Sequence, residues 1–164
     1  GPVETVIPLW EKLADQASPT NTEQWGLLDI RAGIPTVYEQ TIDAFIPQMT
    51  NMQLVNGVSF TKGCYTGQEV VARMKYLGKL KRRMYLATSD VADRPMPGDE
   101  LYSPNSDSRQ GAGRVVDARP SPEGGFEMLI VSEISTAEED NLHLMGQNGP
   151  KINLKPLPYA FEQE

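Results

Sequence analysis

The chain has 164 residues, of which 39% are hydrophobic, and a net charge of −7. That length suits one domain or two small ones. No apolar run approaches the roughly 20 residues of a membrane-spanning helix, and no secretory signal is visible, so we expect no membrane association and a cytoplasmic location. The negative net charge disfavours direct nucleic-acid binding, because phosphate contacts dominate that affinity.

Two residue types that often hold metals occur only once each, as Cys64 and His143. A zinc site or an iron–sulfur cluster usually takes about four ligands, mostly cysteine and histidine. We therefore expect no metal bound by this chain alone and no disulfide within it. The single cysteine also fits a reducing compartment.

The first half of the chain predicts few regular elements. Gly1-Pro2 resembles the remnant of a cleaved tag and is set aside. Apolar residues at helical spacing predict a helix over 8–17, with Pro8 in its first turn. The apolar run 25–30 predicts a short strand, and residues 36–56 are expected to be mostly irregular, because Pro47 interrupts any helix there.

A second helix is predicted over 67–77. Thr66 and Glu69 have the spacing of a capping box with Thr66 as N-cap. An apolar stripe follows at helical spacing, and Gly78 stands where a C-cap glycine belongs.

After Gly78 the pattern changes to short β-prone runs separated by turn residues. Six strands are predicted, over 83–88, 100–102, 114–118, 126–132, 142–145 and 152–157, with a hairpin loop over 120–125. This spacing is typical of a small antiparallel barrel. We expect an α+β fold, with residues 3–80 forming part of an α+β body and residues 81–164 a barrel domain.

The segment before the predicted 67–77 helix is the main candidate site. Cys64 lies near the expected helix N-terminus and close to Lys62, and both features favour a reactive thiol. Gly63 and Gly67 would let the backbone approach a ligand. The alternative is that Cys64 is a small packed residue and the glycines only shape a turn.

Positive charge is concentrated immediately after this segment. Six basic residues and no acidic one lie between positions 70 and 83: Arg73, Lys75, Lys79, Lys81, Arg82 and Arg83. Such a run is most often a solvated face, but next to the glycine corner it is also suited to the anionic tail of a ligand.

Residues 57–73 include the string Lys-Gly-Cys-Tyr-Thr-Gly-Gln-Glu at 62–69. This string resembles the hallmark of the YgfZ family, folate-binding relatives of the glycine cleavage T-protein. The resemblance extends upstream through 32–35 and 45–48 and downstream to 156–159, as in the C-terminal half of that family.

The resemblance implies a folate-binding accessory protein for iron–sulfur cluster synthesis or repair, which indirectly supports tRNA modification. Its implied partners are iron–sulfur enzymes or cluster-assembly proteins, and its cofactor is tetrahydrofolate. Lys62 and Cys64 are then the candidate catalytic pair, and the expected cofactor-binding residues are Gly63, Tyr65, Gly67, Gln68, Glu69 and Arg73.

One departure from the wider family stands at Arg31, where the T-protein and many relatives carry glutamate. This weakens the expectation of a folate-reading carboxylate there, and the other acidic contacts belong to the half that is absent. Two further hypotheses remain open: a tetrahydrofolate-dependent one-carbon (aminomethyl-type) transferase, and an RNA-binding module that uses the basic run.

Overall fold

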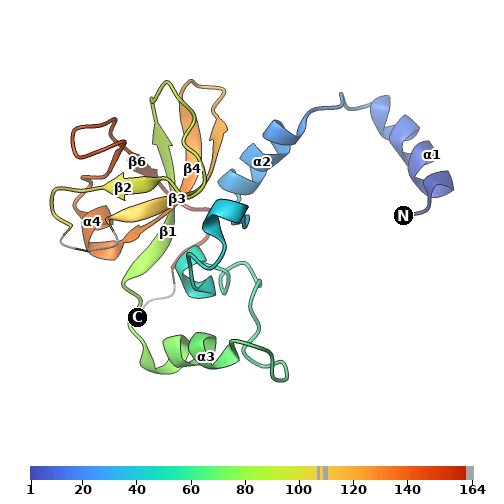
Figure 1. Ribbon diagram of the computed structural model, residues 1–164. Coiled ribbons are helices and arrows are strands. Elements are labelled where there is room, and N and C mark those ends of the chain that lie inside the picture. The colour runs from blue at the N-terminus through green and yellow to red at the C-terminus, as the bar shows by residue number, and fades with distance from the viewer. Residues whose placement is uncertain (107, 109–110, 162–164) are drawn as a thin grey trace.

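The computed structural model describes residues 1–106, 108 and 111–161, so residues 107, 109–110 and 162–164 of the expected 81–164 barrel lie outside it. The fold is α+β, as expected: the described residues form four α-helices, two 3-10 turns and one six-stranded antiparallel sheet (Figure 1). In chain order the elements are α1 (Val3–Ala14), α2 (Thr22–Arg31), η1 (Glu39–Thr41), η2 (Pro47–Thr50), α3 (Gln68–Leu77), β1 (Arg82–Ser89), β2 (Glu100–Tyr102), β3 (Gly113–Pro120), β4 (Phe126–Glu133), α4 (Ile134–Glu138), β5 (His143–Leu144) and β6 (Asn153–Lys155).

The sheet has the order β5-β2-β3-β4-β1-β6 and curls into a half-barrel. Each of the six predicted strands is confirmed, as is the hairpin loop, since Pro120 pairs with Phe126 at the β3–β4 turn. A bridge between His143 and Lys151 links the segment before β6 back to β5, so the curl brings the two ends of the sheet together. The domain boundary near residue 80 stays a prediction.

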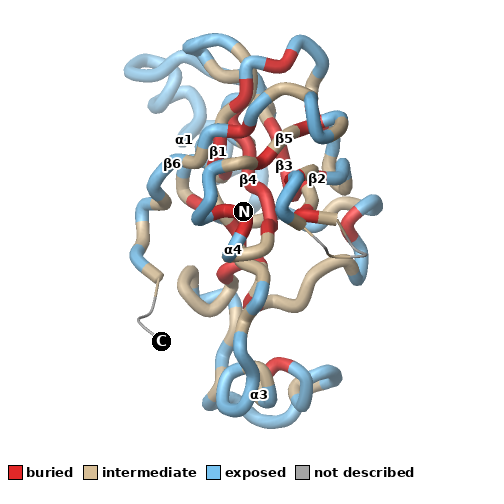
Figure 2. Tube along the Cα trace, turned by 90° about the vertical axis from the view of Figure 1, so that its left-hand side faces the viewer, coloured by how far each residue is buried: buried red, intermediate tan, exposed pale blue. Residues whose placement is uncertain are grey.

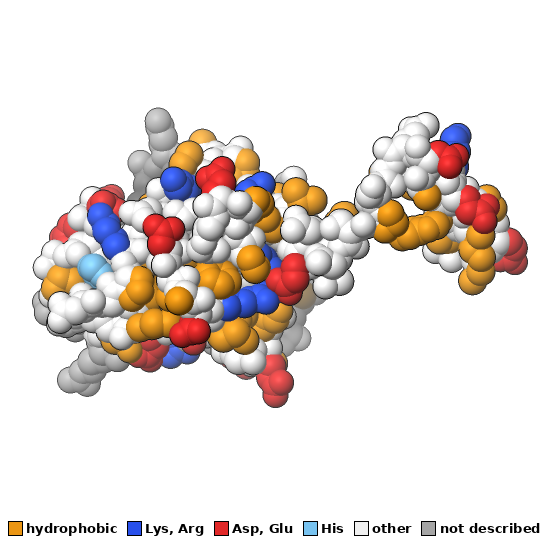
Figure 3. Space-filling view, turned by 90° about the horizontal axis from the view of Figure 1, so that it is seen from above, with side chains coloured by type: hydrophobic (Ala, Val, Ile, Leu, Met, Phe, Trp, Pro, Cys, Tyr) orange, Lys and Arg blue, Asp and Glu red, His pale blue; other side chains and the backbone are white. Residues whose placement is uncertain are grey.

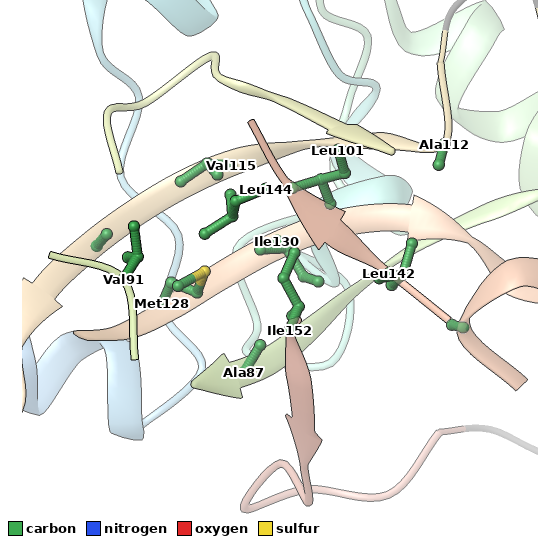
Figure 4. Close-up of a cluster of buried hydrophobic side chains, with 12 residues drawn as sticks. Ala87, Val91, Leu101, Ala112, Val115, Met128, Ile130, Leu142, Leu144 and Ile152 are labelled. Carbon is green, nitrogen blue, oxygen red and sulfur yellow. The ribbon is translucent and has the colours of Figure 1, made fainter. Parts of the chain in front are cut away.

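Strand β4 supplies both hydrophobic clusters, because successive side chains of a strand point to opposite faces. Met128 and Ile130 point into the concave face, where they pack with Ala87, Leu101 and Ile152 among others (Figure 4). On the opposite face, Leu129 and Val131 pack with Ile30 of α2 and Met84 of β1. The strand is therefore buried along its length, and Figure 2 shows the buried residues concentrated in the sheet.

The prediction of a strand over 25–30 is wrong, because this segment lies in α2. Asn21 caps the helix, and its side chain accepts a hydrogen bond from the Gln24 amide at 3.1 Å. Leu27 and Ile30 are the buried residues of α2, three positions apart and therefore on one helical face, and α2 packs on β3 and β4. A short apolar run does not distinguish strand from helix. Here the apolar side chains are buried by packing of one helical face on the sheet.

The first helix begins earlier than predicted, at Val3, and Pro8 lies inside it rather than in its first turn. The carbonyl of Pro2 accepts hydrogen bonds from the amides of Thr5 and Val6, which sets this earlier start. All twelve residues of α1 are described and none is buried. Figure 3 shows α1 set apart from the rest of the protein, with hydrophobic side chains on its surface.

Residues 36–56 form two 3-10 turns within otherwise irregular chain, as expected. They cover the convex face of the sheet, where η2 contacts both β1 and α3. In the described part of the chain, no helix is long and apolar enough to cross a membrane.

Candidate functional site

The Cys64 corner is an exposed loop that leads into α3. The hydroxyl of Ser59 accepts hydrogen bonds from the amides of Thr61 and Lys62, at 3.4 and 3.2 Å, which shapes the turn before the cysteine. Lys62, Gly63 and Cys64 are all exposed. The thiol is therefore available to solvent, and the alternative of a packed cysteine does not hold in this structure.

The helix boundary agrees with prediction, but the predicted capping box is wrong. Gly67 is the N-cap of α3 in the left-handed conformation, with φ of 85°, and the described residues include no side-chain cap. Glycine adopts this left-handed backbone conformation at little energetic cost, whereas a threonine in the same conformation would be strained. At the other end Gly78 is the C-cap, as predicted, but it is extended rather than left-handed; a Cβ there would lie 2.6 Å from the sulfur of Met74.

The candidate catalytic pair is close in sequence, and Lys62 makes its contact with Tyr65. Its Nζ lies 5.0 Å from the centre of the Tyr65 ring, a cation–π contact. The role of Lys62 as activator of Cys64 stays a prediction. Of the expected cofactor-binding residues, Tyr65 and Gln68 are half-buried, while Glu69 and Arg73 are exposed on α3.

The corner can form one wall of a folate site. It presents an aromatic ring at Tyr65, a carboxylate at Glu69 and a cation at Arg73, the groups that suit a conjugated ring, its N–H edge and an anionic tail. A Cβ built on Gly63 or Gly67 meets no heavy atom of the described chain within 4 Å. The surface is thus open here, and these residues fit folate as one face of a site rather than as an enclosed pocket.

A pocket does exist near the C-terminal end of α3, which sequence reasoning missed. It has a volume of about 350 Å³ and is lined by Gln48, Gln53, Leu54, Phe60, Met74, Lys75, Gly78, Lys79, Leu80, Arg83 and Phe161. The basic run indicated its cationic rim, but the remaining lining comes from distant parts of the chain.

A network of polar side chains on β3 was also missed. Arg119 donates to the Tyr38 hydroxyl at 2.7 Å, and that hydroxyl donates to Asp117 at 2.7 Å. Arg119 also pairs with Glu23 of α2 at 3.3 Å, and Arg94 joins Glu23 at 3.2 Å. Burial, and then the hydrogen bond to Asp117, raise the pKa of Tyr38. The network joins α2 to the sheet.

Arg31 has a clear partner in the structure. Its guanidinium donates two hydrogen bonds to the Glu127 carboxylate of β4, at 2.8 and 2.6 Å. The hydrogen bonds from Arg31 lower the pKa of Glu127, and a further bond from the Ser121 hydroxyl has the same effect. The arginine at this position therefore attaches the end of α2 to the sheet.

No protein-family profile matches the chain. Curated proteins do match it over nearly its whole length, and three of these relatives carry the name tRNA-modifying protein YgfZ. The chain is 37% identical to that of Yersinia enterocolitica over 161 residues (98% of this chain, 49% of the relative), 37% identical to that of Sodalis glossinidius over 153 residues (93% and 47%), and 35% identical to that of an Escherichia coli strain over 159 residues (97% and 48%).

The fold is that of an α+β protein with a curled antiparallel sheet and an exposed cysteine turn. These matches confirm the resemblance: the chain is a homologue of the YgfZ family. It spans about half the length of the curated relatives that it matches. Within the described residues, no group of three or more His, Cys, Asp or Glu side chains is placed to hold a metal ion.

Proposed function

We propose that the protein to which this chain belongs supports tRNA modification. One observation carries the proposal: 98% of the chain matches a curated relative named a tRNA-modifying protein, at 37% identity. Because the match spans about half of that relative, the proposal concerns the function of a protein that contains the remaining part as well.

We propose further that the protein acts as a folate-binding accessory factor for iron–sulfur enzymes, with tetrahydrofolate as its cofactor. The motif at 62–69 supports this through its resemblance to the family hallmark, and the open corner supports it through its chemistry. Tyr65 offers a ring for stacking, Glu69 a carboxylate for N–H groups, and Arg73 a cation for the glutamate tail.

A genetic experiment tests this function. A strain that lacks its YgfZ protein is complemented with a full-length protein that carries this segment, either unchanged or as Cys64→Ala. Modified nucleosides in tRNA and the activity of an iron–sulfur enzyme are both measured. We expect the unchanged protein to restore both and Cys64→Ala to restore them only partly. Lys81→Gln, an exposed residue of the basic run, is the matched control. Failure of the unchanged protein to restore tRNA modification would contradict the proposal.

The second candidate is a tetrahydrofolate-dependent aminomethyl-type transferase. The exposure of Cys64 favours it, because a group-transfer role needs a thiol that substrates can reach. An assay of one-carbon transfer to tetrahydrofolate by the full-length protein distinguishes the two. Turnover that Cys64→Ala abolishes would favour the transferase; complementation without such turnover would favour the accessory role.

A further inference from the structure

The pocket at the C-terminal end of α3 combines positive charge with aromatic surface. Lys75 Nζ lies 3.8 Å from the centre of the Phe60 ring, and the Arg83 guanidinium lies 4.3 Å from the centre of the Phe161 ring. Lys79 adds a third cationic side chain to the lining. A ligand in this pocket meets flat apolar surfaces bordered by cations, which suits a planar ring that carries an anionic group.

Two side-chain amides of the same pocket carry buried acceptors. Gln48 is 5% exposed, and its Nε2 donates to the Val71 carbonyl at 2.6 Å, so its orientation is set. The Oε1 atoms of Gln48 and Gln53 are both buried, and neither has a hydrogen-bond partner in the described part of the chain. Buried polar atoms are nearly always paired in folded proteins. Two acceptors without donors in one pocket wall favour a ligand that brings N–H groups.

The size of the pocket restricts that ligand to a compact one. Small-molecule pockets usually measure about 300–1,000 Å³, so 350 Å³ lies at the lower end of the range. The net charge of −7 disfavours a long polyanion, whereas the local excess of lysine and arginine favours a single anionic group.

We propose that this pocket binds a free purine nucleoside monophosphate of the guanine type. The phosphate lies by Lys75 and Lys79, the base lies against the aromatic surface, and the donor edge of guanine faces Gln48 and Gln53. Guanine presents a ring N–H beside an amino group, which can supply donors to the two acceptors of the pocket wall. The proposal does not depend on the proposed function, because every residue that lines the pocket is in this chain and none belongs to the 62–69 motif.

An NMR titration of the 164-residue chain with GMP tests the assignment. We expect saturable shifts of amides in the pocket, Gly78 and Lys79 among them, with a dissociation constant below about 1 mM that rises with salt. Guanosine and ribose 5-phosphate should each bind about tenfold more weakly, and AMP should bind more weakly than GMP. Shifts that do not saturate, or equal binding of ribose 5-phosphate and GMP, would overturn the proposal.

Substitutions in exposed residues separate binding from folding. The double variant Lys75→Gln/Lys79→Gln should weaken GMP binding about tenfold, the usual sum of two exposed charge contacts. Lys81→Gln lies in the same basic run but outside the pocket, and should change the affinity less than twofold. An unchanged affinity in the double variant would overturn the proposal.

Two competing ligands complete the test. Folic acid shares the donor edge of guanine through its pterin ring, so tighter binding of folic acid than of GMP in this pocket would overturn the nucleotide assignment. A five-nucleotide RNA that binds more tightly than GMP would overturn the assignment to a free nucleotide. Weaker binding of both supports it.

Discussion

The hydroxyl of Tyr159 donates a hydrogen bond to the carbonyl of Gly33 at 2.8 Å, which joins the C-terminal tail to the end of α2. The same hydroxyl accepts a hydrogen bond from the side-chain amide of Asn51 at 3.3 Å. Gly33 has φ of 67°, and a Cβ on it would lie 2.7 Å from the Tyr159 ring. The contact thus requires both the tyrosine hydroxyl and the absence of a side chain at residue 33.

Replacement of either residue should destabilise the protein. Tyr159→Phe removes the hydroxyl and should lower the free energy of unfolding by about 1 kcal/mol, the usual net value of one hydrogen bond. Gly33→Ala introduces both the clash and backbone strain, and should cost about 2 kcal/mol or more. Urea denaturation measures both. A smaller effect for Gly33→Ala than for Tyr159→Phe would contradict the steric argument.

The Arg31–Glu127 pair should make stability depend on acid pH. Because Arg31 holds the folded-state pKa of Glu127 below its ordinary value of 4.5, the pair stabilises the protein above that value. The stabilisation is lost as the pH falls through the lowered pKa. At neutral pH, Glu127→Gln should lower the free energy of unfolding by about 1 kcal/mol, since the arginine is 44% exposed.

Thermal melts of the unchanged protein and of Glu127→Gln, taken from pH 7 down to pH 2, check this expectation. The difference between the two should be constant at neutral pH and shrink at low pH. Glu123→Gln, which changes a carboxylate that Arg31 feels only at longer range, is the matched control. A difference that persists unchanged at pH 2 would rule out this linkage.

Cys64 should react with an alkylating reagent in the native state. Because the thiol is exposed, we expect one equivalent to be incorporated at a rate within about threefold of that in denaturant. If Lys62 activates the thiol, as the sequence predicts, Lys62→Gln should slow the native reaction, and Lys81→Gln should not. Equal rates in the two variants would remove Lys62 from the candidate pair.

Helix α1 should contribute little to stability. Its twelve described residues make no buried contact, and isolated helices shorter than about 12–15 residues are marginal in water. Hydrogen exchange should therefore show little protection in α1 and strong protection in β4. Deletion of residues 1–17 should change the free energy of unfolding by less than about 0.5 kcal/mol. Protection of α1 comparable to that of α2 would contradict its isolation in the structure.

This chain should bind tetrahydrofolate only weakly. The corner is open, and a few exposed charge contacts of about 0–1 kcal/mol each fall short of the roughly 8 kcal/mol of micromolar binding. Calorimetry should give a millimolar dissociation constant that rises with salt. Low-micromolar, salt-insensitive binding by the chain alone would place the pterin pocket within it.

The strands and the cysteine turn could be predicted from the sequence, because both depend on interactions between residues close along the chain. Short β-prone runs bounded by turn formers mark β1 to β6, and Gly78 marks the C-terminal end of α3, although the N-cap is Gly67 rather than the predicted Thr66. The helix over residues 22–31 could not be predicted in this way, since the periodicity of a short apolar run is ambiguous until tertiary packing covers one of its faces. Only the tertiary structure decided that Arg31 meets Glu127 across 96 positions and that Tyr159 meets Gly33 across 126. Such pairs, like the pocket that joins Gln48 to Lys75 and Phe161, depend on the register and curl of the sheet, which no local pattern specifies.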